Sequence, residues 1–256
     1  MKKPFILISN DDGIKAEGLR ELAGAMAVFA EVMICAPDTE KSGYSHAISI
    51  LRDLKPVKVR FKGLKAFAIN GTPADCVKLG ILALAGKKPD LVVSGINHGP
   101  NNGRFILYSG TVGAAAEAAI MGIPAIAVSL ASYEEKRDFK TAAEYAAKIA
   151  EAVTRGKVRI PNHSILNINV PDASAVRIKG VKFMEKGRCE YEEKYIKKGC
   201  GYRLYIGNRI RIGGFADKAD SHALEQGYIT VTPLSFDLNN RKLMKLIKAE
   251  KAVFKA

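Results

Sequence analysis

The sequence lacks any hydrophobic run that approaches the roughly 18 residues of a membrane-spanning helix. Its first apolar segment covers only residues 5–8, which is too short for the core of a secretion signal. We therefore expect a cytoplasmic protein with no membrane partner. The four cysteines form no CxxC pair, so neither a zinc ribbon nor a disulfide framework is indicated. Internal repeats and low-complexity segments are also missing, which is typical of an ordinary globular protein.

The formal net charge is +14, and a basic surface of this kind can serve nucleic acids, membrane headgroups or anionic substrates. Much of the excess lies in residues 179–211 and 241–255. Few aromatic side chains are interleaved there, although a surface that stacks single-stranded bases requires them. We interpret this charge as solvated surface, and a nucleic-acid partner is not favoured.

The apolar periodicity predicts an α/β protein, and 256 residues are enough for one large domain or for a main domain with a smaller appendage. Up to about residue 160, short buried strands alternate with amphipathic helices. Beyond that point the pattern changes to strands, a segment typical of projecting hairpins and a basic amphipathic tail helix. The expected strands are residues 5–8, 31–36, 57–61, 66–69, 91–94, 125–128, 165–170, 176–184 and 227–234, and the expected helices are 19–29, 73–84, 112–120, 139–153, 220–225 and a tail helix marked by Leu243, Leu246, Ile247 and Val253.

Two adjacent carboxylates, Asp11 and Asp12, follow the first predicted strand and precede Gly13. In open α/β sheets, ligands bind at the carboxyl ends of such strands. Two carboxylates about 4 Å apart repel each other by roughly 1 kcal/mol in water and by roughly 4 kcal/mol at an effective dielectric constant near 20. A hard divalent cation would relieve this repulsion. A turn whose aspartates cap the next helix is the alternative, and this stretch alone leaves both hypotheses open.

A polar loop at residues 39–46 follows the predicted strand at residues 31–36. It contains Ser42, Ser45 and His46, which would reach the same edge of the sheet as the aspartates. Residues of these types are also common in loops that only face solvent, so the loop has both interpretations.

A second polar loop follows the predicted strand at residues 91–94. Its Asn97 offers a neutral oxygen ligand, and glycines at 95, 99 and 103 permit a close backbone approach to a bound group. A helix then begins at Ser109-Gly110-Thr111, where free N–H groups, two hydroxyls and the positive end of the helix dipole suit a phosphate. An ordinary capping motif is the alternative for this helix start.

Five segments carry the most specific pattern in the sequence. They are Asn10-Asp11-Asp12-Gly13, the loop around Ser42, Asn70-Gly71-Thr72-Pro73-Ala74-Asp75, Ser94-Gly95-Ile96-Asn97-His98-Gly99 and Tyr108-Ser109-Gly110-Thr111-Val112. Together they resemble the SurE family of stationary-phase survival proteins, and the likeness covers nearly the whole chain.

The resemblance implies a 5'-nucleotidase, a metal-dependent enzyme that hydrolyses nucleoside monophosphates. It implies a Rossmann-like catalytic domain at residues 1–160, whose mostly parallel sheet is flanked by helices. Residues 161–256 would form a smaller region of hairpins and a terminal helix that joins subunits into a homodimer or homotetramer.

One divalent cation per subunit, Mg²⁺ or Mn²⁺, is implied, with Asp11, Asp12, Ser42 and Asn97 as its ligands and both aspartates as catalytic residues. The resemblance places the phosphate site at the Ser109 helix start, with Asn101 at its mouth. The expected substrate or phosphate contacts are Asn10, Gly43, Ser45, His46, Gly95, Asn101, Ser109, Gly110 and Thr111.

The mechanism expected from these residues is attack by a metal-activated water. In a second hypothesis, Asp11 or Asp12 attacks phosphorus directly and forms an aspartyl-phosphate. Polyphosphate or other small phosphate esters are alternative substrates. In a non-catalytic alternative, the chain is a basic module that binds nucleotides or nucleic acid.

Overall fold

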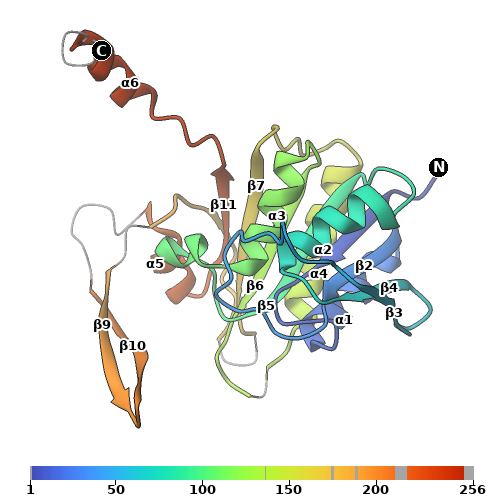
Figure 1. The fold of residues 1–256 in the computed structure, drawn as a ribbon, viewed down its shortest axis with the longest axis horizontal. Coiled ribbons are helices and arrows are strands. Elements are labelled where there is room, and N and C mark those ends of the chain that lie inside the picture. The colour runs from blue at the N-terminus through green and yellow to red at the C-terminus, as the bar shows by residue number, and fades with distance from the viewer. Residues whose placement is uncertain (1, 136, 174–175, 188–189, 211–217, 251–256) are drawn as a thin grey trace.

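The computed structural model describes residues 2–135, 137–173, 176–187, 190–210 and 218–250, and it shows a mostly parallel, nine-stranded mixed sheet flanked by helices (Figure 1). The strand order is β3-β4-β2-β1-β5-β6-β7-β11-β8. This architecture confirms the predicted fold class. The strands of the sheet are β1 (Phe5–Ser9), β2 (Glu31–Pro37), β3 (Pro56–Lys58), β4 (Lys65–Ile69), β5 (Leu91–His98), β6 (Ala125–Ala131), β7 (Ser164–Pro171), β8 (Val181–Phe183) and β11 (Ile229–Ser235).

The described helices are α1 (Glu17–Ala27), α2 (Pro73–Leu79) with a π-helical extension η1 (Gly80–Leu84), the 3₁₀ helix η2 (Gly103–Leu107), α3 (Gly110–Ile120), α4 (Lys140–Thr154), α5 (Asp220–Glu225) and α6 (Arg241–Ala249). Of these, α1 to α4 cover the two faces of the sheet. Residues of α1 and α4 belong to one buried hydrophobic cluster, and residues of α2 and α3 belong to a second.

Strand β1 shows why a continuous apolar run was the right signal for a central strand. Its side chains alternate between the two hydrophobic clusters, with Ile6 and Ile8 in the cluster of α1 and α4 and Phe5 and Leu7 in that of α2 and α3. Each of these side chains is almost fully buried, and burial of one such side chain contributes roughly 1.5–3 kcal/mol. A strand covered on both faces needs apolar residues at every position.

The sheet brings the ends of several strands to one edge. Strand β1 pairs in parallel with β2 and β5, and β5, β6 and β7 continue the parallel pairing. The loops that follow these strands therefore leave the sheet at the same edge. This edge is where all candidate site residues lie.

The sheet continues past residue 160 through β7, β11 and β8, so the expected division into domains 1–160 and 161–256 stays a prediction. The strand expected at residues 176–184 is limited to the three residues of β8, which pair with β11. None of the described helices combines the length and apolarity that a membrane-spanning segment needs.

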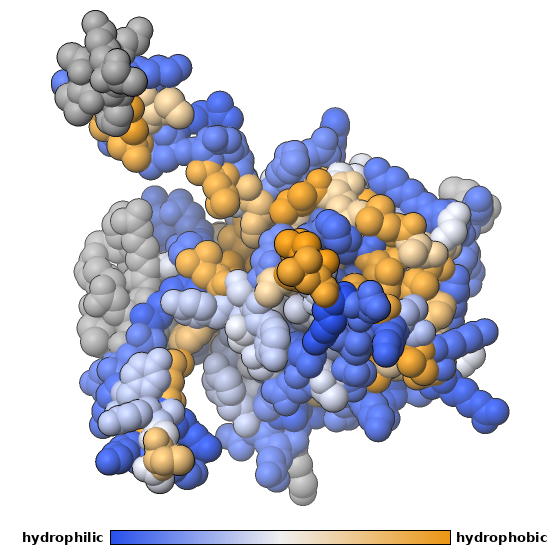
Figure 2. Space-filling model, in the orientation of Figure 1, coloured by the Kyte–Doolittle hydropathy of each residue, from blue (hydrophilic) through white to orange (hydrophobic). Residues whose placement is uncertain are grey.

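The expected hairpin and tail helix both project from the body of the molecule (Figure 1). The hairpin consists of β9 (Glu190–Lys198) and β10 (Gly201–Ile210), which pair antiparallel and form their own two-stranded sheet. Helix α6 has no buried residue, and its apolar side chains are exposed beside basic ones (Figure 2). Val253 and Cys189 lie outside the described residues.

Candidate active site

The turn after β1 carries two acids that do not cap a helix. Asp11 is 3% exposed, and Asp12 beside it is half-buried. Helix α1 begins only at Glu17, and its N-cap residue Ala16 makes no side-chain cap, so the helix-capping hypothesis for the aspartates is wrong. Burial raises the pKa of both carboxyls, and burial together with the charge of Asp11 raises the pKa of Asp12 to about 7.

The N-terminus of α3 faces Asp11. The Thr111 hydroxyl donates a hydrogen bond to Asp11 Oδ1, and backbone hydrogen bonds from Thr111 and Gly110 lower the pKa of this carboxyl against the larger effect of burial. A Cβ atom at position 110 would lie 2.8 Å from Asp11 Cβ, so only glycine permits this approach. Ser109 caps the helix by accepting a hydrogen bond from the Val112 N–H at 3.1 Å. The structure thus brings Gly110 and Thr111 to Asp11, while Ser109 has the ordinary capping role.

Asn97, at the end of β5, has its side-chain oxygen beside the Thr111 hydroxyl, which also contacts Asp11. Its amide nitrogen donates to the carbonyl oxygens of Gly99 at 2.7 Å and His98 at 3.3 Å. Its Oδ1 atom lies 3.4 Å from the Thr111 hydroxyl, which also contacts Asp11. The two oxygens, Asp11 Oδ1 and Asn97 Oδ1, therefore lie on either side of one hydroxyl.

The serine loop is joined to the aspartate turn through its backbone. The Lys41 N–H donates to the Asp11 carbonyl oxygen at 2.7 Å. The Ser42 hydroxyl donates to Glu40 Oε1 at 2.7 Å, and no contact between the Ser42 hydroxyl and Asp11 or Asp12 is found among the described residues. Donation to Glu40 leaves the lone pairs of the hydroxyl oxygen available to a cation.

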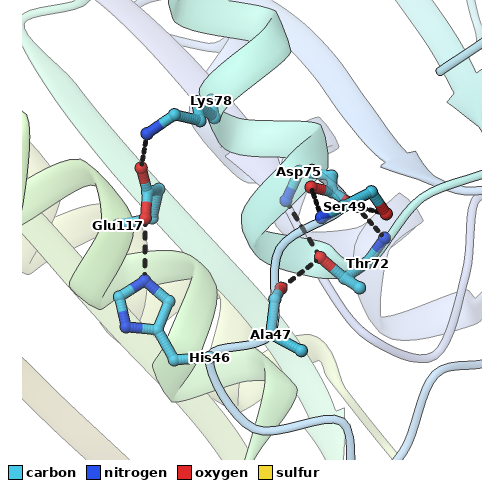
Figure 3. A network of polar contacts seen from close by, with 7 residues as sticks. All are labelled: His46, Ala47, Ser49, Thr72, Asp75, Lys78 and Glu117. Carbon is cyan, nitrogen blue, oxygen red and sulfur yellow. Dashed lines mark hydrogen bonds and ion pairs between the residues drawn. The ribbon is translucent and has the colours of Figure 1, made fainter. Parts of the chain in front are cut away.

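Two other members of this loop are anchored away from the aspartates. Ser45 donates from its hydroxyl to the Leu107 carbonyl oxygen at 2.6 Å. His46 Nε2 lies 2.8 Å from Glu117 Oε2, and the other oxygen of this carboxylate pairs with Lys78 Nζ at 2.6 Å (Figure 3). The hydrogen bond from His46, followed by the Lys78 interaction, lowers the pKa of Glu117 against the opposing effect of burial. These contacts fasten the loop to η2 and α3, while Gly43 is exposed with a φ of +78°.

Three expected substrate contacts shape the backbone around the site. The amide nitrogen of Asn10 donates to the Gly13 carbonyl oxygen at 3.0 Å and holds the aspartate turn. A Cβ atom on Gly95 would lie 2.3 Å from the Val128 carbonyl oxygen, so a side chain does not fit there. Asn101 is buried, and its amide nitrogen donates to Ser129 Oγ at 2.9 Å.

The fold places two further residues, His98 and Arg137, beside Asp12. The His98 N–H donates to Asp12 Oδ2 at 3.2 Å, and the His98 ring pairs with the guanidinium of Arg137. Burial and the Arg137 charge lower the pKa of His98, and the same charge lowers the pKa of Asp12 against the larger effect of burial. Arg137 belongs to no sequence motif, because only the fold brings the segment after β6 next to the aspartate turn.

The donor set fits a hard cation. Across the described residues, no group of three or more histidine, cysteine, aspartate or glutamate side chains is arranged to hold a metal ion. A site here would depend on two carboxylates and on neutral oxygens, and this set suits Mg²⁺ or Mn²⁺ rather than zinc. Asn10 Oδ1, in the same turn, is buried without a hydrogen-bond partner in the described part of the chain. A buried carboxylate, a half-buried one beside it and an unsatisfied oxygen are the features that a bound cation would stabilise.

Comparisons with known proteins give one consistent result. A family model described as "Survival protein SurE" matches residues 6–193. A protein of Geotalea daltonii named "5'-nucleotidase SurE" is 43% identical over 95% of this chain and 97% of its own length, and one of the same name from Syntrophomonas wolfei is 40% identical over 94% and 92%. The crystal structure of a SurE protein from Aquifex aeolicus superposes with a TM-score of 0.82 at 37% identity, covering 97% of this chain and all of the other.

Proposed function

The chain belongs to the SurE family, and from this premise we propose that it is a 5'-nucleotidase that hydrolyses nucleoside monophosphates to nucleoside and phosphate. The observation that carries the proposal is the pair of buried Asp11 and half-buried Asp12 at the carboxyl edge of the sheet, with the Thr111 hydroxyl between Asp11 Oδ1 and Asn97 Oδ1. The reaction is inferred from the names of the relatives, and the residues proposed to perform it are those of this site.

We propose that Asp11, Asp12, Asn97 and Ser42 hold one divalent cation per chain, Mg²⁺ or Mn²⁺. When bound, such an ion supplies a Lewis acid that offsets phosphate charge and makes a bound water more acidic. Ligation requires both carboxylates in their ionised form, so Asp12 must release the proton that its raised pKa favours below about pH 7. Thr111 and the backbone of Gly110 hold the Asp11 carboxylate in place by hydrogen bonds.

The residues on the other side of Asp12 would bind the phosphate. Arg137 carries a positive charge close enough to Asp12 to lower its pKa, and it would attract the phosphate dianion. Because the pKa of His98 is lowered, its imidazole is neutral at pH 7. It would therefore orient Arg137 rather than donate a proton to the leaving group.

Asp11 is poorly placed as a nucleophile, because its carboxylate already accepts hydrogen bonds from Thr111 and faces the start of α3. These contacts favour its role as a ligand over the aspartyl-phosphate alternative. A cytoplasmic homodimer or homotetramer is part of the proposal, supported by the exposed apolar side chains of α6 and of the β9–β10 hairpin. Light scattering at several protein concentrations would measure the oligomeric state.

The decisive experiment is a phosphate-release assay on Asp11→Asn with AMP and either Mg²⁺, Mn²⁺ or a chelator. We expect activity in the wild-type chain with metal, none with chelator, and at least a thousandfold loss in the variant, because one of two charged ligands is gone. Circular dichroism would confirm that the variant is folded, and Asp53→Asn, at an exposed position, serves as the matched control. Full activity in the folded Asp11→Asn variant would contradict the proposal, and parallel assays with polyphosphate and ribose 5-phosphate would test the alternative substrates.

A further inference from the structure

A cavity of about 650 Å³ opens beside the candidate site, at the same edge of the sheet. Its walls come from the loop after β5, the end of β6 and the end of β7, and α5 and strand β10 close the remaining side. Figure 1 shows α5 between the sheet and the β9–β10 hairpin. Pockets that hold small ligands range over roughly 300–1,000 Å³, so this volume suits a molecule of nucleoside size.

One wall of the cavity is joined to the aspartate turn. Tyr133 lines the cavity, and its ring lies beside that of His98, with centroids 6.4 Å apart. His98 in turn donates its backbone N–H to Asp12 at 3.2 Å. A ligand with its phosphate at Asp12 would therefore extend past Tyr133 into the cavity.

The lining suits the base and ribose of a nucleotide. The rings of Phe105 and Tyr133, from separate segments, offer aromatic surface on which a base can stack. Asp172 and Glu225 also line the cavity, and their carboxyl groups disfavour a phosphate group there. The phosphate end of the substrate is thus directed out of the cavity, toward Arg137.

Asn102 supplies a hydrogen-bonding group in this wall. The residue is 6% exposed and lines the cavity, yet its side-chain amide makes no hydrogen bond to any other residue in the part of the chain that the structure describes. The next residue, Gly103, donates its N–H to the buried carboxylate of Asp220 on α5 at 3.2 Å. The loop that carries Asn102 is therefore fixed before any ligand arrives, which lowers the entropic cost of binding.

We propose that this cavity binds the nucleoside half of the substrate, with the base stacked against Phe105 and Tyr133 and hydrogen-bonded by Asn102. The proposal rests on the proposed nucleotidase function and names the part of the substrate that the phosphate site does not hold. An amide both donates and accepts hydrogen bonds, so it can recognise the edge of a base.

Titration calorimetry with adenosine, guanosine, cytidine and uridine tests this site without any catalysis. We expect at least one nucleoside to bind the wild-type chain in the presence of Mn²⁺. Asn102→Leu keeps the side-chain volume but removes the amide, and Phe105→Ala removes a stacking surface. Each variant should weaken nucleoside binding about tenfold, since a lost hydrogen bond or stack of this kind is worth roughly one such factor. Val28→Ser, at an exposed position on the far end of α1, is the matched control and should bind as the wild type does.

Assays of phosphate release from AMP and from ribose 5-phosphate separate the two proposals. The ratio of kcat/KM for AMP to that for ribose 5-phosphate should fall about tenfold in Asn102→Leu. If no nucleoside binds the wild-type chain at millimolar concentration, or if both cavity variants bind as the wild type does, the cavity proposal is overturned whether or not the chain is active. A chain that binds adenosine but releases no phosphate from AMP would overturn the nucleotidase proposal and leave the cavity proposal standing.

Discussion

Asp12→Asn should make the metal-free protein more stable at pH 8 and remove most of its stabilisation by metal. The pKa of Asp12 is raised to about 7 from an ordinary value of 3.8, mainly by burial and then by the charge of Asp11. This shift corresponds to roughly 4 kcal/mol that the folded state loses when Asp12 ionises, taken as an upper limit. An asparagine of the same shape carries no charge and avoids this loss.

The direction of this pH dependence follows from the number of protons that the folded and unfolded states bind. Between about pH 4 and pH 7, the folded state keeps a proton on Asp12 that the unfolded state has released, so the stability of the wild type falls as the pH rises through this window. The variant lacks this contribution. The difference in free energy of unfolding between the variant and the wild type should therefore grow by about 2–3 kcal/mol between pH 5 and pH 8. This corresponds to several degrees in Tm for a chain of this size.

Thermal unfolding followed by circular dichroism, with chelator at pH 5 and pH 8, measures this difference. Addition of Mn²⁺ at a hundred times its Kd should then stabilise the wild type by about 2.7 kcal/mol and the variant by much less. Asp53→Asn controls for the general effect of a lost carboxylate on a basic protein. If the variant exceeds the wild type in stability by the same amount at both pH values, the reasoning from burial is refuted. If Mn²⁺ stabilises the variant as much as the wild type, the assignment of Asp12 as a ligand is refuted.

Three further substitutions test the surroundings of the site. Glu117→Gln should cost about 1–2 kcal/mol in urea unfolding, because its carboxylate pairs with both His46 and Lys78; no measurable loss would show that these pairs contribute little. Gly113→Ala should weaken Mn²⁺ binding at least about tenfold in calorimetry. The new Cβ would lie 2.4 Å from the Ser45 carbonyl oxygen and must displace the serine loop that carries Ser42. Unchanged affinity for Mn²⁺ would show that this loop does not contribute to the metal site. Arg137→Ala should raise the KM for AMP about tenfold with little change in kcat, and an unchanged KM would remove Arg137 from the phosphate site.

The parts of the fold that the sequence predicted are those with strong local signals. Residues 5–8 and 91–93 are continuous apolar runs, and both lie in central strands buried on two faces. The helix expected from residue 73 does begin at Pro73, with Thr72 as its N-cap and Asp75 completing a capping box. The helix ends in a π-helical turn from Gly80, which no local pattern indicated.

The candidate site depends on contacts between distant segments, and these were harder to predict. The pattern at Ser109-Gly110-Thr111 indicated a helix start with free N–H groups, but only the hydrogen bonds of Thr111 and Gly110 to Asp11 show that this start faces the aspartate turn. His46 was expected near a phosphate, whereas its partner is Glu117, 71 residues away. Arg137 had no signal in the sequence, because its position beside Asp12 depends on how the sheet is assembled.

The buried carboxylate of Asp220 joins three segments that would otherwise be independent. It accepts backbone hydrogen bonds from Gly103 in η2, from Gly187 at 3.0 Å and from Ser221 at 2.8 Å. One side chain thus connects three amides that exchange their hydrogens with solvent only when the contact opens. These amides should behave as one cooperative opening unit in hydrogen exchange, and Asp220→Asn should accelerate all three together. Local unfolding near the proposed nucleoside cavity would then be controlled by a residue that touches neither phosphate nor metal.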